Sequence, residues 1–131
     1  MKNDSNPNID MLKSEMKDFI RERDWEKFHS PKNLAMSIAI ESAELMEHFQ
    51  WMSSDEALKI IENPETLCEV RDELSDILAY CLSLANYLEI DVTSSFLSKL
   101  EKNRRKYPSD RVYGKSTKYN RIDCDDQETM K

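Results

Sequence analysis

The sequence predicts an all-α protein, a four-helix bundle, and three observations support this prediction. Apolar residues recur at helical spacing through most of the chain. Only one glycine, Gly114, occurs in 131 residues, whereas glycine-rich phosphate loops need glycine where the backbone approaches a ligand or takes a positive φ. A P-loop or a dinucleotide-binding turn is therefore excluded. The length is typical of a single domain with a modest core.

The apolar repeats predict four long helices, which cover about residues 9–24, 31–49, 65–88 and 91–107. Ser30 and Pro31 provide a cap and a first turn for the second of these helices. A shorter helix, capped in the Ser53–Glu56 segment, is expected to run to about Glu62. Residues 1–108 then form the helical domain. Residues 109–131 are polar without a helical period, and they are expected to form a C-terminal arm.

The predicted helix over residues 31–49 is apolar almost all round. One face carries a stripe of four large residues, namely Leu34, Ile38, Leu45 and Phe49. The opposite face carries Met36, Ile40 and Ala43. Such a helix is normally buried on all sides. Since four helices can hardly enclose one of their own number, we expect this helix to lie at a subunit interface.

Charge and cysteine content limit the function classes. The net charge of −7 argues against a protein that binds a nucleic acid polymer. The N-terminus has no apolar signal core and no run reaches membrane length, so no membrane partner is expected. Three cysteines (Cys68, Cys81 and Cys124) without paired spacing suggest reduced thiols in a cytoplasmic protein. Cys81 fits a core position better than a nucleophile.

Two acidic pairs lie inside the most apolar helices. They are Glu41 with Glu44, and Glu73 with Asp76. Residues three apart project from neighbouring helical turns, and both pairs border apolar stripes. Packing the two helices through these stripes would bring four carboxylates together, where repulsion and lost hydration would raise their pKa values. A hard cation such as Mg²⁺ relieves this repulsion and also binds phosphate oxygens, which would let an acidic protein hold an anionic substrate.

These carboxylates have two other interpretations. A single E-x-x-E in a helix is usually a solvated face, and this explanation suits Glu69 and Asp72 better. A di-iron bundle needs an E-x-x-H on each of two helices. The chain has only two histidines, and His48 does not follow a glutamate at that spacing. The two E-x-x-H motifs that a di-iron site requires are therefore not both present.

The acidic pairs and their flanking sequences resemble those of the MazG-like all-α NTP pyrophosphohydrolases, in particular the dCTP pyrophosphatase branch. The resemblance extends from about Met11 to Pro108. The matching segments are Arg23–His29, Pro31–Leu34, His48–Trp51, Glu73–Tyr80 and Lys102–Pro108. It implies a four-helix fold assembled as a homotetramer, with sites built between subunits. Dimeric dUTPases and phosphoribosyl-ATP pyrophosphatases share the acidic motif.

The resemblance also implies roles for individual residues. Glu41, Glu44, Glu73 and Asp76 would hold Mg²⁺, with Mn²⁺ as a substitute, and would form the catalytic set. The substrate-binding residues would comprise aromatic residues around the base, polar residues near base or sugar, and residues that reach the phosphates. These are Trp25, Trp51 and Tyr80, then His29 and Asn33, and finally Lys99, Asn103 and Arg105.

The expected function is Mg²⁺-dependent hydrolysis of a nucleoside triphosphate to a monophosphate and pyrophosphate. The expected substrate is dCTP or a related pyrimidine deoxynucleotide, removed in nucleotide-pool house-cleaning. Two alternatives remain open at this point. One is a pyrophosphohydrolase for dUTP or for dNTPs in general, and the other is a non-catalytic helical oligomer that binds nucleotides.

Overall fold

The computed structural model describes residues 8–116 and 118–121, and all regular elements in this part of the chain are helical. The all-α prediction is therefore confirmed. The chain divides into two compact units, Met1–Ile90 and Asp91–Lys131. Among the described helices, none has both the length and the apolarity that crossing a membrane requires. The expectations for residues 1–7, for Cys124 and for the arm beyond Arg121 lie outside the described residues.

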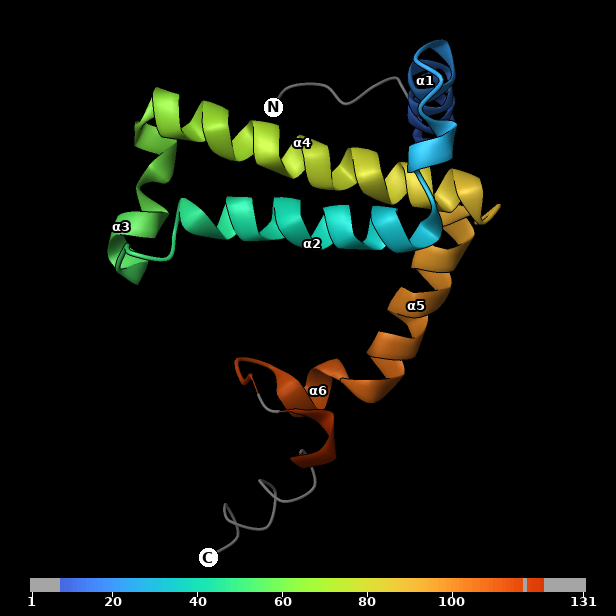
Figure 1. Ribbon diagram of the computed structural model, residues 1–131. Coiled ribbons are helices and arrows are strands. Elements are labelled where there is room, and N and C mark those ends of the chain that lie inside the picture. Colours follow the sequence, from blue (N-terminus) through green and yellow to red (C-terminus); the bar gives the residue numbers. More distant parts are fainter. Residues whose placement is uncertain (1–7, 117, 122–131) are drawn as a thin grey trace, which may run out of the picture. The chain divides into compact units, whose positions relative to one another are not determined.

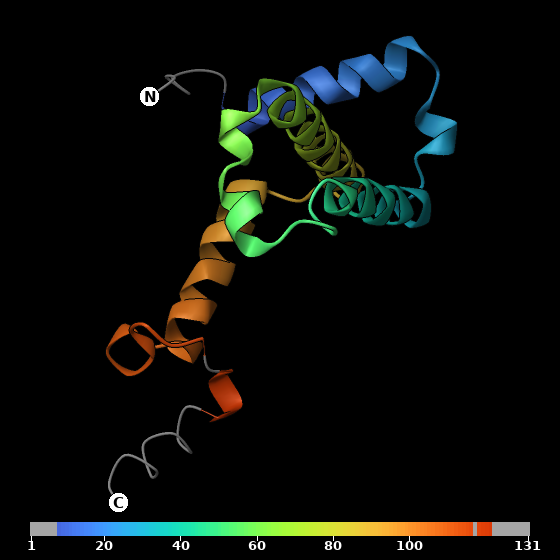
Figure 2. The same ribbon diagram turned by 90° about the vertical axis from the view of Figure 1, so that its left-hand side faces the viewer.

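The first unit contains three long helices and three short helical segments. Its elements are α1 (Ile9–Glu22), η1 (Glu26–Phe28), α2 (Pro31–Glu47), α3 (Ser54–Leu58), η2 (Ile60–Glu62) and α4 (Pro64–Tyr87). The helices α2 and α4 lie side by side and run antiparallel (Figure 1). Figure 2 shows α1 lying against α4 on a side away from α2. Two hydrogen bonds fix α1 near the end of α4: Asn86 Nδ2 donates to the Lys13 carbonyl at 2.7 Å, and Lys13 Nζ donates to the Ile90 carbonyl at 2.8 Å.

The second unit is the fourth long helix with the segment that follows it. Its elements are α5 (Val92–Lys106), α6 (Ser109–Val112) and η3 (Tyr119–Arg121). Asp91 caps α5 by accepting a hydrogen bond from the Ser94 amide at 2.9 Å. The segment after Pro108, where the sequence has no helical period, contains the two short turns α6 and η3. A local contact accompanies these turns: the rings of Tyr107 and Tyr119 pack edge to face, with centroids 6.1 Å apart. The boundary predicted after Pro108 stays a prediction.

The predicted helix starts are confirmed by side-chain caps. The Ser30 hydroxyl accepts from the Asn33 amide, with Pro31 in the first turn. Ser53 and Glu56 form a reciprocal capping box. The short helix does not run unbroken to Glu62, because it ends at Leu58 and a separate 3₁₀ turn follows. Asn63, expected only to stop that helix, also caps α4 through the Thr66 amide at 3.2 Å.

Two helices end where a non-glycine residue takes a positive φ. Asp24 after α1 and Glu89 after α4 both have φ of 53°. In each case the following amide reaches back to the helix, as Trp25 N–H does to the Ile20 carbonyl at 3.1 Å. This bond pattern is the Schellman motif. It reverses the chain after α1 and brings the Trp25 ring to 5.9 Å from the Phe19 ring.

The core of the first unit lies where α2 and α1 meet α4. Its buried apolar side chains are Ile20, Leu34, Leu82 and Ala85, and Leu34 is only 1% exposed. The α2 stripe was predicted correctly, since Ile38, Leu45 and Phe49 are all at least half-buried.

The apolar period of the predicted 65–88 helix passes through Val70, Leu74, Ile77, Cys81, Leu84 and Leu88, and only part of this stripe is covered. Val70, Ile77 and Leu84 are half-buried, whereas Leu74 and Cys81 are exposed. The core position expected for Cys81 was therefore wrong within the single chain. The reason is that α2 and α1 together cover only part of the apolar stripe of α4, which leaves Leu74 and Cys81 uncovered.

Candidate active site

Three of the four predicted carboxylates meet between the two antiparallel helices. Glu41 comes from α2, and Glu73 and Asp76 come from neighbouring turns of α4. One oxygen from each lies within 4.8 Å of the others. We refer to Glu41, Glu73 and Asp76 as the carboxylate cluster. Glu44, one turn further along α2, is exposed and is not part of this cluster within the single chain.

The electrostatics of the cluster favour a bound cation. Burial raises the pKa of Glu41 above its usual value, and the charges of Glu44, Asp76 and Glu73 raise it further, in that order. Glu44 therefore acts on the cluster through its charge although it lies outside it. Three carboxylate oxygens this close together offer the hard oxygen ligands that Mg²⁺ prefers, so the donor set fits a hard divalent cation.

An open cavity of about 310 Å³ adjoins the cluster on the side of α1. Glu41 and Asp76 form part of its wall, and aromatic rings form much of the rest. The rings belong to Phe19, Trp25, His29 and Tyr80. They make a continuous series of edge contacts, with centroids 5.9 Å apart for Phe19–Trp25 and 6.4 Å for both Trp25–His29 and His29–Tyr80. The cavity therefore combines an acidic side with an aromatic side, and its volume is at the lower end of ligand sites.

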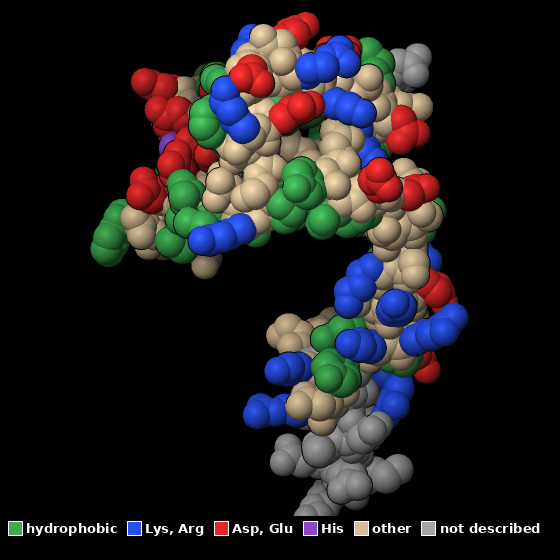
Figure 3. Space-filling model, turned by 45° about the vertical axis from the view of Figure 1, so that its right-hand side comes forward, with side chains coloured by type: hydrophobic (Ala, Val, Ile, Leu, Met, Phe, Trp, Pro, Cys, Tyr) green, Lys and Arg blue, Asp and Glu red, His purple; other side chains and the backbone are tan. Residues whose placement is uncertain are grey.

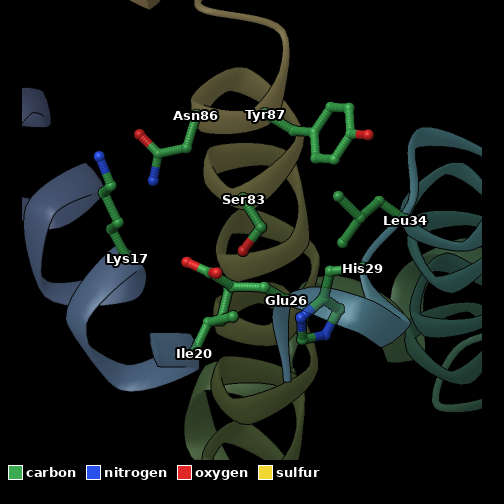
Figure 4. A pocket seen from close by; sticks show the side chains of 8 residues that line it. All are labelled: Lys17, Ile20, Glu26, His29, Leu34, Ser83, Asn86 and Tyr87. Atoms are coloured by element: carbon green, nitrogen blue, oxygen red, sulfur yellow. The ribbon is translucent and has the colours of Figure 1, made fainter. Parts of the chain in front are cut away.

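His29 stands between this cavity and a second one. The second cavity, of about 260 Å³, also includes Lys17, Glu26 and Asn86 in its lining (Figure 4). The Nδ1 atom of His29 is buried and has no hydrogen-bond partner among the described residues. A buried nitrogen without a partner costs about 1–3 kcal/mol. A ligand able to bond to this nitrogen would recover that energy.

Two predicted substrate residues of the first unit do not line either cavity. Trp51 follows α2, and its side chain is 89% exposed. Asn33 is exposed in the first turn of α2, and its Nδ2 donates to the Phe28 carbonyl at 3.0 Å. In the single chain Asn33 therefore holds the 25–30 connection, which carries Trp25 and His29, against α2.

The predicted phosphate-binding residues all lie on α5 in the second unit. Lys99 is exposed, and Asn103 is half-buried. Arg105 Nε lies 3.4 Å from Glu101 Oε1, an exposed pair one turn apart. Figure 3 shows that lysine and arginine side chains gather over α5 and the segment after it, whereas acidic side chains are frequent on the first unit. This charge separation is hidden by the net charge of the whole chain.

Sequence reasoning missed several residues at the site. Met16, Phe19 and Ser83 line the acidic and aromatic cavity, and His48 contacts Glu73. Phe19 could have been found from its position on the apolar side of α1, six residues before Trp25. His48 carried no comparable signal, because the turn that follows α2 sets the position of its ring.

Comparisons with known proteins agree with one another. The family model described as MazG-like matches residues 36–122. dCTP pyrophosphatase 1 from Bos taurus is 36% identical over 115 residues, which cover 88% of this chain and 68% of the bovine protein. The Homo sapiens protein of the same name is 35% identical over 116 residues, with the same two shares. The crystal structure of a pyrophosphatase from Archaeoglobus fulgidus matches with a TM-score of 0.72 and 41% identity, covering 82% of this chain and 99% of that chain.

Proposed function

The chain belongs to the MazG-like family, in its dCTP pyrophosphatase branch, and from this membership we propose that it hydrolyses dCTP and related pyrimidine deoxynucleotides with Mg²⁺. The products are the nucleoside monophosphate and pyrophosphate. The observation that carries the proposal is that Glu41 and Asp76 belong both to the carboxylate cluster and to the wall of the aromatic cavity. A base held against the rings would place its triphosphate beside the carboxylates.

The carboxylate cluster is suited to hold Mg²⁺, with Glu44 adding negative charge from the next turn of α2. When bound, the ion would neutralise phosphate charge and polarise the bond that breaks. Water attacks the α-phosphorus, the bond to the bridging oxygen of the β-phosphate breaks, and pyrophosphate leaves. The protein contributes by aligning the α-phosphate with this water, since positioning accounts for much of the catalysis in phosphoryl transfer.

The aromatic side of the cavity is suited to a pyrimidine. Trp25 and Tyr80 offer flat apolar surface, and His29 carries the buried Nδ1 without a partner. A rotation of the imidazole ring that exposes this nitrogen to the cavity would let a polar edge of the base bond to it. Recognition by a polar group that would otherwise stay unsatisfied gives strong discrimination against bases lacking the matching atom.

The remaining substrate residues point to a site completed by other copies of the chain. Trp51 is almost fully exposed in the single chain, and the exposed face of α2 carries Met36 and Ile40, each 53% exposed. We propose a homotetramer in which such surfaces are covered. In it, Lys99, Asn103 and Arg105 on α5 reach the triphosphate. Cys68 and Cys81, which are free thiols in the described part of the chain, favour a reducing compartment such as the cytoplasm.

The test is a substrate panel in ¹⁸O-labelled water. Purified full-length protein is incubated with Mg²⁺ and each of the common NTPs and dNTPs, and the products are separated by ion exchange. We expect monophosphate and pyrophosphate, formed fastest from dCTP. Attack at the α-phosphorus places ¹⁸O in the monophosphate and none in the pyrophosphate.

Each other outcome has a definite meaning. A preference for dUTP, or equal rates for all dNTPs, would keep the reaction and reject the assigned substrate. Release of inorganic phosphate with a nucleoside diphosphate would reject the reaction. Tight nucleotide binding without turnover, in Mg²⁺ or Mn²⁺, would favour a non-catalytic nucleotide-binding oligomer.

A further inference from the structure

A histidine outside the predicted site lies between two glutamates of α4, one of which belongs to the carboxylate cluster. His48 Nε2 is 3.9 Å from Glu73 Oε1, and His48 Nδ1 is 3.7 Å from Glu69 Oε2. The side chains of His48 and Glu73 are each 21% exposed, whereas that of Glu69 is 56% exposed. The imidazole thus has one nitrogen directed at the cluster and the other at an outer carboxylate.

The backbone at the end of α2 fixes the position from which the His48 side chain projects. His48 is the C-cap residue of α2, and the amides of Phe49 and Gln50 both donate to the Met46 carbonyl, at 3.0 and 2.9 Å. On α4, Glu69 and Glu73 are four residues apart, so their side chains project from the same helix face. The end of α2 therefore delivers the ring to a face of α4 that presents a carboxylate on each side of it.

His48 is the one basic side chain in ion-pair contact with the carboxylate cluster among the described residues. Separations of 3.7 and 3.9 Å are longer than direct hydrogen bonds. A small ring rotation or a bridging water would convert each of them into one. A carboxylate that ligates a metal needs such an outer partner, which holds its free oxygen and limits its rotation.

We propose that His48 is a positioning residue for Glu73, and that Glu69 in turn holds the imidazole. The inference rests on the proposed metal site, and it adds two residues that orient one of its ligands. His48 touches no substrate in this role. It restricts Glu73 to the side-chain conformations in which its oxygen faces Glu41 and Asp76.

The test measures Mn²⁺ binding to the full-length protein by calorimetry, without nucleotide. H48L removes both ring nitrogens, and its affinity should fall by about tenfold, the lower end of the range for loss of an outer partner. H48Q places an amide nitrogen near the position of Nε2, and it should restore most of the affinity. H48N places its amide nearer the position of Nδ1, away from Glu73, so it should behave like H48L.

Glu69 has a matched charge control on the same helix. E69Q removes the carboxylate that holds the ring. D72N removes an exposed charge that is adjacent to Glu73 in the sequence but does not contact His48. Both lower the negative charge near the cluster. We expect E69Q to weaken Mn²⁺ binding more than D72N does. Far-ultraviolet circular dichroism verifies that every variant keeps its helices, and if H48L does not fold, the comparison of H48Q with H48N decides.

Dependence of turnover on Mg²⁺ provides a second readout. H48L should need more Mg²⁺ for half-maximal rate while approaching the wild-type kcat at saturation, since the ligand itself is kept. Unchanged Mn²⁺ affinity in H48L, or equal affinities in H48Q and H48N, would overturn the positioning role while leaving the proposed enzyme intact. No Mn²⁺ binding by the wild-type protein would instead remove the metal site and this inference with it.

Discussion

Glu41 is the residue on which the proposed chemistry depends most. It contributes to the carboxylate cluster and to the cavity wall, and its pKa is raised by burial and by three neighbouring carboxylates. We predict that E41Q and D76N each lower kcat/KM by about 10²- to 10³-fold. A loss of this size is typical when one preorganised electrostatic group is removed from an active site. Helical content should be unchanged, because both substitutions keep the side-chain volume. Wild-type turnover in either variant would show that the cluster does not hold the catalytic metal.

The raised pKa of Glu41 also has a consequence for stability. Because the folded protein holds this proton more tightly than the unfolded chain, the contribution of Glu41 is fully present below pH 4.5 and is lost as pH rises through the folded pKa. In EDTA, we therefore expect E41Q to melt at a higher temperature than the wild type at pH 7. The difference should disappear by pH 4. If E41Q raised the melting temperature equally at pH 7 and pH 4, the result would contradict the electrostatic cause.

At the scale of single elements, the helix ends show where the backbone carries strain. Glu89 has a φ of 53° after α4, in a position that glycine occupies at low cost. We predict that E89G stabilises the protein by about 0.5–1 kcal/mol. Chemical denaturation measures this change. E89A is the matched control: alanine removes the charge but keeps the Cβ, so it should give no such gain.

The equivalent turn after α1 positions a residue of the site. The positive φ of Asp24 allows Trp25 N–H to bond to the Ile20 carbonyl, and the indole then packs against Phe19. Aspartate tolerates this conformation better than most residues. The end of one helix thus sets the aromatic side of the cavity.

At the scale of the whole molecule, the first unit leaves many large apolar side chains exposed. Met36, Ile40 and Met46 on α2 are each more than half exposed, as is Leu78 on α4. Exposed apolar side chains of this kind are typical of an interaction surface. If the proposed homotetramer forms through α2, the double variant M36K/I40K should have a smaller mass than the wild type by light scattering. A wild-type protein that is already monomeric, or an unchanged mass in the variant, would argue against the proposed assembly through α2.

Helix positions, most caps and the α2 stripe could be predicted from the sequence, because these depend on residues close together in the chain. Periodicity located α1, α2, α4 and α5, and the Ser30 and Ser53 caps follow from local residue types. The apolar period could not predict how α1 and α4 end, because nothing in it reveals that Asp24 and Glu89 take a positive φ.

The sequence by itself determined the fold class, the family resemblance and the acidic pairs. Two carboxylates three residues apart inside an apolar helix can be recognised from their spacing along the chain alone. Only the tertiary structure decided which of them meet. The antiparallel packing of α2 on α4 brings Glu41 to Glu73 and Asp76 and leaves Glu44 exposed. It also brings His48 between Glu69 and Glu73. The physical reason is that helical period fixes which side chains share a face, whereas the angle and register of packing fix which faces meet.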